Sequence, residues 1–338
     1  METKQLGTTE QDLALAGELL RQGQLVAFPT ETVYGLGADA LNETAVAQIY
    51  AAKGRPSDNP LIVHVAEKTD IAPLVREIPE KAKKLFDRFF PGPLTVILPK
   101  SDKIGKVVSG GLDTVAVRMP ENPVAHRLLQ LAGVPVAAPS ANTSGLPSPT
   151  RAKYVQEDMN GKIAAIVDGG DCAYGVESTV ITLATPTPTL LRPGAVTKEM
   201  LEAEIGPIAV APAVLEKMAD GETAASPGMK YKHYAPKADV TLLDGTFEQF
   251  KAYVDAHAEQ DPSCLCFTGE AEKLGVPCVE YGREGDGADQ AKHIFRCLRA
   301  LDEQGDAVVY ARCPQKDGLS MAVYNRLIRA AAFRVIKL

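Results

Sequence analysis

Three short polar segments combine residue types and spacings that suit the binding of a small charged substrate. Thr30-Glu31-Thr32 places two hydroxyls and a carboxylate directly after the apolar run 24–29. Lys53-Gly54-Arg55 presents two cations on a turn, and the prolines that follow lower the cost of ordering these cations and Asn59 around a phosphate. Ser140-Ala141-Asn142 follows the apolar run 134–138 and offers uncharged donors and acceptors suited to an adenylate or a phosphate.

Each of these segments also has a plain structural interpretation, which the sequence leaves open. Thr30-Glu31-Thr32 also fits a simple turn, the charges of Lys53 and Arg55 fit a solvated surface, and Ser140 to Gly145 fits a capped helix start. His64 lies inside the apolar run 61–65, where a buried histidine bonded to the backbone is commoner than a ligand-binding one.

Other kinds of catalytic site have no clear signal in the sequence. It contains no phosphate-binding Gly-x-x-x-x-Gly-Lys-Ser/Thr motif, no evident Ser-His-Asp order and no histidine-rich metal cluster, so we predict no metal held by the protein itself. The run 35–40 matches Gly-x-Gly-x-x-Ala, but in a dinucleotide fold the glycines lie directly between a strand and a helix. Here the next helix begins only after Asn42, and we interpret the glycines as sites of close backbone packing. The predicted chemistry is therefore positioning and charge stabilisation rather than covalent catalysis.

Alternating strand and helix patterns predict an α/β chain with two domains, residues 1–205 and 237–338. In the first domain we expect helices at 44–53 and 79–90 and strands at 24–29, 61–65, 94–98, 114–118, 134–138, 164–167, 178–183 and 189–192. In the second we expect strands at 240–243, 263–267, 276–280 and 307–311 and helices at 288–301 and 319–333. Residues 206–236 are rich in proline and glycine and far longer than the ~4–6 residues of an ordinary loop, which predicts a linker.

The composition is that of a globular protein of 338 residues, 45% hydrophobic and 23% charged. No apolar run approaches the ~20 residues of a membrane helix, and residues 1–20 lack a secretory signal pattern, so we expect a cytoplasmic protein without membrane contact. The net charge of -7 argues against a purely electrostatic nucleic-acid binder, although residues 53–118 carry a local excess of Lys and Arg. The six cysteines form no Cys-x-x-Cys pair and are expected to be reduced core residues.

The motifs at 29–37, 53–61, 91–95 and 139–142 together resemble the YrdC-type threonylcarbamoyl-AMP synthase family. The segments 226–231 and 233–236 resemble the linker of the long, two-domain form of that family. This resemblance implies a YrdC-like twisted mixed sheet with helices, followed by a smaller Rossmann-like C-terminal domain. The length of the linker and its aromatic and cationic end further predict that residues 206–236 act as an active-site lid.

The resemblance also implies a nucleotidyltransferase reaction: L-threonine, bicarbonate and ATP give threonylcarbamoyl-AMP and pyrophosphate. The product would pass to the tRNA threonylcarbamoyl transferase machinery, which forms N6-threonylcarbamoyladenosine in tRNA. The family signature, implied to be catalytic, falls on Lys53, Arg55, Ser140 and Asn142. The implied ATP contacts are Arg55, Asn59, Thr114, Ser140, Ser148, Arg192 and either Tyr231 or Tyr234. The implied threonine contacts are Thr32, His64, Arg118, Ala138 through its backbone, and Ser178. Mg²⁺ is expected to accompany ATP by bridging its phosphates.

Two alternatives compete with this prediction. Hydrogenase maturation proteins contain similar domains, but they also carry zinc-finger modules with Cys-x-x-Cys pairs that this sequence lacks. A non-catalytic double-stranded RNA-binding protein is the alternative from another class, and weak RNA binding is kept among the expected partner interactions. RNA binding through several phosphates would fall steeply with salt, whereas ATP turnover would fall gently.

Overall fold

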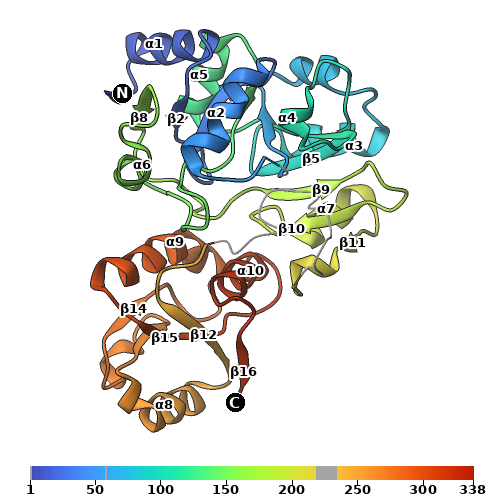
Figure 1. Ribbon diagram of the computed structural model, residues 1–338. Helices are drawn as coiled ribbons and strands as arrows, with labels where there is room; N and C mark the ends of the chain where they lie inside the picture. The colour runs from blue at the N-terminus through green and yellow to red at the C-terminus, as the bar shows by residue number, and fades with distance from the viewer. Residues whose placement is uncertain (1, 58, 218–233) are drawn as a thin grey trace. The chain divides into compact units, whose positions relative to one another are not determined.

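The computed structural model describes residues 2–57, 59–217 and 234–338 and divides the chain into two compact units (Figure 1). The first unit comprises Met1–Ser144 and Ser148–Val214. The second comprises Gly145–Pro147, Leu215–Lys217 and the described residues from Tyr234 onward. No helix of the described residues is both long and apolar enough to cross a membrane.

The first unit is built on an eleven-stranded mixed sheet, as the family resemblance implies. From one edge to the other, the strands are β1 (Lys4–Leu6), β8 (Ala165–Val167), β2 (Val26–Phe28), β3 (Gly35–Asp39), β7 (Val136–Ala137), β4 (Ile62–His64), β6 (Thr114–Arg118), β5 (Leu94–Pro99), β9 (Thr179–Thr182), β10 (Thr189–Arg192) and β11 (Ala209–Val210). The parallel pairs include β4 with β6 and β5 with β9, and the antiparallel pairs include β4 with β7 and β5 with β6.

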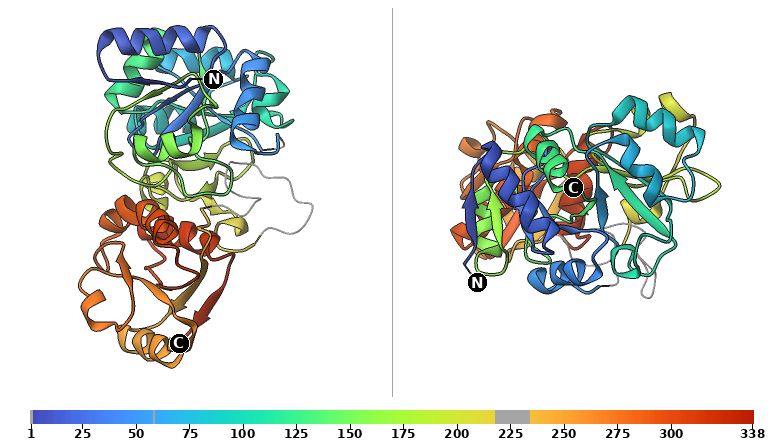
Figure 2. Two further views of the ribbon diagram at one scale, coloured as in Figure 1. Left: turned by 60° about the vertical axis from the view of Figure 1, so that its left-hand side comes forward. Right: turned by 90° about the horizontal axis from the view of Figure 1, so that it is seen from above.

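Helices cover both faces of this sheet. They are α1 (Glu10–Arg21), α2 (Glu43–Lys53), α3 (Glu80–Phe89), α4 (Lys106–Ser109), α5 (Pro123–Ala132), α6 (Ala152–Met159) and α7 (Lys198–Ile205), with short 3₁₀ turns η1 (Lys68–Leu74) and η2 (Pro212–Val214). Helices α1 and α5 pack side by side (Figure 2) and share one apolar cluster with β2, while α2, α3 and α7 contribute to a second, larger cluster.

Helix α2 shows how the sequence positions a polar turn. The Asn42 side chain accepts a hydrogen bond from the Ala45 amide at 3.1 Å, which caps the start of the helix. Gly54 ends it in the left-handed conformation, with φ of 63°. The helix predicted at 44–53 thus begins one residue earlier and ends as predicted, which places Lys53 on the last turn of α2 with Arg55 directly beyond it.

The glycine-rich run 35–40 forms strand β3 and not a nucleotide-binding turn. A Cβ atom on Gly37 would lie 2.8 Å from side-chain atoms of both Phe28 and Val136. The prediction of close backbone packing is therefore confirmed, and a side chain at this position would force neighbouring strands to move.

The predicted linker begins too early. Ala209 and Val210 form β11, which pairs in parallel with β10, and Val214 is still part of the first unit. A two-residue strand between prolines has no periodicity to detect, so the sequence did not reveal it. Residues 218–233, which make up the later part of the predicted lid, lie outside the described part of the chain.

The second unit contains a five-stranded parallel sheet, in agreement with the implied Rossmann-like domain. Its strands, in spatial order, are β14 (Cys278–Glu280), β13 (Ser263–Cys266), β15 (Val308–Arg312), β12 (Asp239–Asp244) and β16 (Val335–Lys337). Its helices are α8 (Phe247–Ala256), α9 (Gly287–Gln304) and α10 (Ser320–Ala330), with 3₁₀ turns η3 (Ala258–Gln260) and η4 (Ala271–Lys273). In Figure 1, α8 lies on one side of this sheet and α9 and α10 lie on the other.

Candidate active site

The parallel pairing of β4 with β6 brings two predicted threonine ligands together. His64 and Arg118 are partners in the register, so they lie side by side at the carboxyl ends of the two strands. Both side chains are buried. The NH2 group of Arg118 donates to Oε1 of buried Glu31 at 2.5 Å, which joins the Thr30-Glu31-Thr32 segment to the strand ends. The Nε group of Arg118 is buried and has no hydrogen-bond partner, so this guanidinium keeps a donor that a second carboxylate could use.

His64 is held in its neutral form. Burial, and then the positive charge of Arg118, lower the pKa of His64 to about 3. Its Nδ1 atom lies 3.2 Å from the Ile62 carbonyl oxygen, so a neutral ring would donate its proton there. The imidazole therefore contributes shape and hydrogen bonding to the site but no positive charge.

This pKa makes the stability of the protein depend on pH. Below about pH 6.5 the unfolded chain takes up a proton on His64 while the folded chain does not, so the free energy of unfolding should decrease as pH falls from about 6.5 toward 3. His64→Gln should reduce that slope by up to about 1.4 kcal/mol per pH unit. Urea unfolding at a series of pH values measures both slopes. Equal slopes in the two proteins would contradict the buried neutral histidine.

Two further predicted threonine ligands lie near the ends of β4 and β6. Ala138 is hydrogen-bonded to β4, and Thr32 follows Glu31, which pairs with Arg118 of β6. The hydroxyls of Thr30 and Thr32 lie 2.9 Å apart and are buried, and Thr30 also donates to the Val33 carbonyl at 2.6 Å. The amide of Ala138 donates to the Ile62 carbonyl at 2.9 Å. A substrate contact through the Ala138 backbone would therefore use its carbonyl oxygen.

A second buried cluster is centred on Ser178. Its hydroxyl lies 2.8 Å from that of Thr95, and Arg192 donates to the Ser178 carbonyl at 3.0 Å and to its hydroxyl at 3.1 Å. Next to it, Ser148 donates to the Glu177 carboxylate at 2.6 Å. The structure thus connects three of the predicted residues, Ser148, Ser178 and Arg192.

Lys53 connects two segments that are far apart in sequence. Its buried ammonium group donates to the carbonyl oxygens of Ser140 and Asn142, the latter at 2.6 Å. The Lys53 carbonyl in turn accepts from the Ser144 amide at 2.8 Å. Within the loop, the Ser140 hydroxyl donates to the Asn142 side-chain oxygen at 2.5 Å. Lys53 therefore fixes the position of the Ser140–Asn142 loop, and its charge is buried, which contradicts the solvated-surface interpretation.

Asn59, a predicted ATP ligand, has a buried side chain without hydrogen-bond partners. Its backbone carbonyl accepts from the Tyr50 hydroxyl at 3.0 Å and from Arg55 at 3.5 Å. Both polar atoms of its side chain are buried without a hydrogen-bond partner. A buried amide left in this state costs about 1–3 kcal/mol, which a hydrogen-bonding ligand would recover.

Thr114, Tyr231 and Tyr234 are not brought into these clusters by any described contact. Thr114 begins β6, four positions before Arg118, and is therefore roughly 13 Å from it along the strand. The Tyr234 ring packs on Phe295 within the second unit, with 5.1 Å between ring centroids. Tyr231 lies outside the described residues. The proposed nucleotide contacts of these three residues stay predictions.

Three functional candidates were missed in the sequence: Thr95, Glu121 and Glu177. Two of them had a signal, since Thr95 lies in a motif that carries the resemblance and Glu177 precedes Ser178. Glu121 had none. Burial, and then the charge of Glu31, raise the pKa of Glu121, which makes it a potential proton acceptor beside the Arg118 pair.

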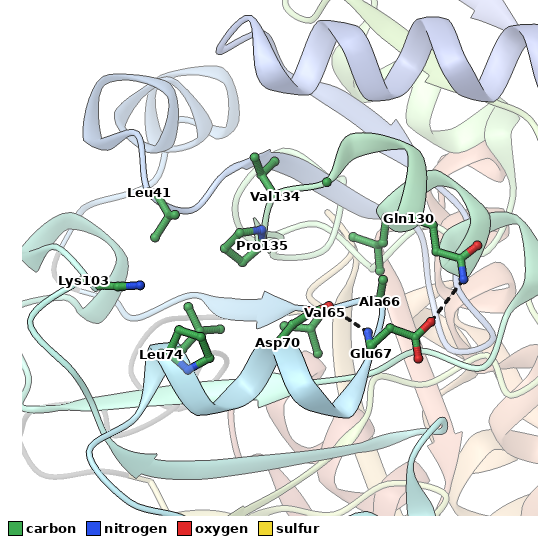
Figure 3. Close-up of a pocket in the computed structure, with 13 residues that line it drawn as sticks. Leu41, Val65, Ala66, Glu67, Asp70, Leu74, Lys103, Gln130, Val134 and Pro135 are labelled. Carbon is green, nitrogen blue, oxygen red and sulfur yellow. Dashed lines mark hydrogen bonds between the residues drawn. The ribbon is translucent and has the colours of Figure 1, made fainter.

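Among the described residues, no group of three or more His, Cys, Asp or Glu side chains is arranged to hold a metal ion. The structure also has a separate pocket of about 400 Å³, whose walls include Leu74, Val134 and Pro135 and whose polar groups include Glu67 and Lys103 (Figure 3). None of the predicted site residues is among those that line it.

Comparisons with known proteins identify relatives over the full chain. A family model described as "Telomere recombination" (Sua5_yciO_yrdC) matches residues 18–194, and one described as "Threonylcarbamoyl-AMP synthase, C-terminal domain" matches residues 196–332. Proteins named threonylcarbamoyl-AMP synthase from Pyrococcus abyssi and Bacillus subtilis are 47% and 46% identical to this chain. The matches cover 97% and 99% of this chain and 96% and 97% of those proteins.

Solved structures agree with this relationship. P. abyssi Sua5 complexed with L-threonine matches with a TM-score of 0.93 and 44% identity, covering 100% of both chains. Escherichia coli YciO covers 57% of this chain and 95% of its own at a TM-score of 0.51 and 20% identity, and so shares the fold alone. The full-length relatives favour the enzyme over non-catalytic RNA binding. From its two matched family models and its full-length relatives, the chain belongs to the Sua5/YrdC family of threonylcarbamoyl-AMP synthases.

Proposed function

We propose that this protein is an L-threonylcarbamoyladenylate synthase, which converts L-threonine, bicarbonate and ATP into threonylcarbamoyl-AMP and pyrophosphate. The observation that carries the proposal is the full-length similarity to enzymes of that name. The similarity to P. abyssi Sua5, which is solved in complex with L-threonine, supports the same substrate. The buried polar clusters of the first unit supply groups of the kinds that these substrates require.

We infer that threonine binds at the carboxyl ends of β4 and β6. Its carboxylate would accept a hydrogen bond from the unpartnered Nε of Arg118, while Glu31 keeps its bond to the NH2 group. Thr32, neutral His64, the Ala138 carbonyl and Ser178 would surround the side chain and amine. This arrangement places one positive guanidinium opposite the two carboxylates, with no second charge from His64.

ATP would be held by the turn after α2 together with the Ser140–Asn142 loop. Asn59 offers an unpartnered amide, and Arg55 and Arg192 offer guanidinium groups for the phosphates. We assign Ser140, Asn142, Ser148, Thr114 and Tyr231 or Tyr234 to the same nucleotide. Mg²⁺ would reach this site with the phosphates of ATP, since in nucleotide-binding enzymes it keeps several waters and is bound largely through the substrate phosphates.

The reaction then needs positioning and charge compensation. The threonine ammonium group loses a proton, and the neutral amine attacks the carbon of bicarbonate or CO₂. With bicarbonate a C–O bond breaks and water leaves, whereas with CO₂ the nitrogen gives up one more proton to water. Either route forms a carbamate. A carbamate oxygen attacks the α-phosphorus of ATP, and pyrophosphate leaves with the electron pair of the broken P–O bond. No protein side chain becomes covalently modified. Burial of the site protects the carbamate and the mixed anhydride, which both decompose in water. Enzymes that modify adenosine in tRNA would consume the product.

The proposal predicts that pyrophosphate release requires L-threonine and bicarbonate together. The assay compares release from ATP with both, with either alone, with serine in place of threonine, and with Mg²⁺ chelated. The kcat/KM for serine should be at least roughly tenfold lower than that for threonine, because one methyl group in a pocket contributes about 1–3 kcal/mol. Equal release without any amino acid would contradict the assignment, and release that persists after chelation would contradict the role of Mg²⁺.

A further inference from the structure

Three cysteines gather on one face of the second sheet, in a unit to which the proposed reaction assigns no threonine-binding residue. The parallel pairing of β13 with β14 sets Cys264 directly beside Cys278, and Cys266 lies two positions further along β13 on the same face. The Cys278 thiol donates a hydrogen bond to the Val276 carbonyl oxygen at 3.2 Å.

The three thiols differ in their access to solvent. Cys264 and Cys266 are fully buried beneath α8, in a cluster that includes Phe250 and Val254. Cys278 is partly exposed, because β14 is the edge strand of the sheet. A small oxidant can therefore reach Cys278, while its two neighbours are shielded.

The electrostatic environment also singles out Cys278. The neighbouring thiols, that of Cys264 more than that of Cys266, lower the pKa of Cys278, which favours its thiolate. The partly exposed Cys313 is a natural comparison, because burial and then Asp244 raise the pKa of its thiol to about 11. Peroxides react with thiolates, so the two partly exposed cysteines should differ in rate.

We propose that Cys278 and Cys264 form a peroxide-sensitive thiol pair that closes to a reversible disulfide between β14 and β13. The Cys278 thiolate attacks one oxygen of a hydroperoxide, the O–O bond breaks, and the leaving hydroxide or alkoxide takes up a proton. The Cys264 sulfur then attacks the resulting sulfenic acid, an S–S bond forms, the S–O bond breaks and water leaves. A dithiol reductant returns both sulfurs to thiols.

The backbone geometry suits this bond. Neighbouring strands in a sheet lie about 4.7–4.9 Å apart, and the Cα atoms of disulfide-bonded residues are usually about 4.4–6.8 Å apart. Cys264 is the in-register neighbour of Cys278 and is therefore the partner, while Cys266 pairs with Glu280 and acts only by favouring the Cys278 thiolate. Reversible pairs of this kind are the usual form in which disulfides occur in reducing compartments.

The test is peptide mapping of the full-length native protein after exposure to a small excess of hydrogen peroxide and then to an alkylating agent. Trypsin cleaves after Lys273, which separates Cys264 and Cys266 from Cys278. The expected result is a crosslink between peptides 252–273 and 274–283 that disappears on reduction. Unlinked, fully alkylated peptides, or irreversible oxidation of Cys278 without a crosslink, would overturn the proposal.

Variants then assign the pair. Cys278→Ser and Cys264→Ser should abolish the crosslink, and the matched control Cys313→Ser should form it at the wild-type rate. Cys266→Ala should keep the crosslink but slow alkylation of Cys278 near neutral pH, an effect that a purely structural role would not produce. A crosslink that persists in Cys264→Ser would refute the assigned partner. The peptide mapping of the wild-type protein tests the crosslink even if a variant at a buried cysteine folds poorly. Its outcome does not depend on the synthase activity.

Discussion

Arg118→Met should lower kcat/KM for threonine on the order of 100-fold or more, chiefly through a higher KM. The substitution removes the only cation proposed to meet the threonine carboxylate, and hydrogen bonds between charged groups contribute about 1.5–3 kcal/mol each. It also leaves Glu31 buried without its positive partner, which costs about 3–5 kcal/mol of stability. Steady-state kinetics with varied threonine and thermal unfolding measure the two effects.

A double variant separates the loss of binding from the loss of stability. Arg118→Met combined with Glu31→Gln removes both charges, so the melting temperature should recover while threonine KM stays high. Arg127→Met is the matched control, since Arg127 pairs with Glu10 at the exposed surface and should leave kinetics and melting temperature near wild type. A return of the threonine KM to its wild-type value in the double variant would refute the contact between Arg118 and the threonine carboxylate.

Lys53→Met should lower kcat/KM for ATP by roughly ten- to a hundredfold, with most of the loss in ATP affinity. The buried ammonium group donates to the carbonyls of Ser140 and Asn142, and losing a hydrogen bond to a charged group costs about 1.5–3 kcal/mol. Methionine keeps most of the side-chain volume of lysine, so the substitution removes mainly the positive charge and its hydrogen bonds. Calorimetric titration of ATP and single-turnover rates separate binding from chemistry.

Lys153→Met provides the control for this prediction, because Lys153 pairs with Glu157 on an exposed face of α6. It should leave ATP binding unchanged. Wild-type ATP affinity and turnover in Lys53→Met would show that the Ser140–Asn142 loop keeps its position without this lysine.

The elements that position the site could largely be predicted from sequence. Asn42 and Gly54 mark the two ends of α2, and the apolar stripe Ala82, Leu85, Phe86 and Phe89 is the buried face of α3. The strands β4, β6 and β10 are visible as apolar runs between turn residues. These signals are local, because helix caps and hydrophobic periodicity are patterns among residues that lie within one or two helical turns of each other in the sequence. Strand β3 and strand β11 gave no such signal, since one is rich in glycine and the other is two residues long.

The contacts within the site could not be predicted in the same way. Glu31 meets Arg118, and Thr95 meets Ser178, only because the sheet order places their strands at one end of the fold. Periodicity carries no information on that order. The roles of the predicted residues came from the family resemblance, whereas the burial of His64, which holds it neutral, became visible only in three dimensions.

The bond between Lys53 and the Ser140–Asn142 loop has a consequence for synthesis on the ribosome. Residue 53 leaves the exit tunnel well before residues 140 to 142, and until they follow, the lysine lacks the carbonyls that hold it. Contacts between distant parts of a chain form late, because closing a long loop costs entropy before the contact repays it. Arg192 completes the Ser178 cluster later still. A nascent chain therefore acquires its substrate site only after more than half of the protein has been translated, and a chain released earlier lacks the partners that these polar groups have in the complete fold.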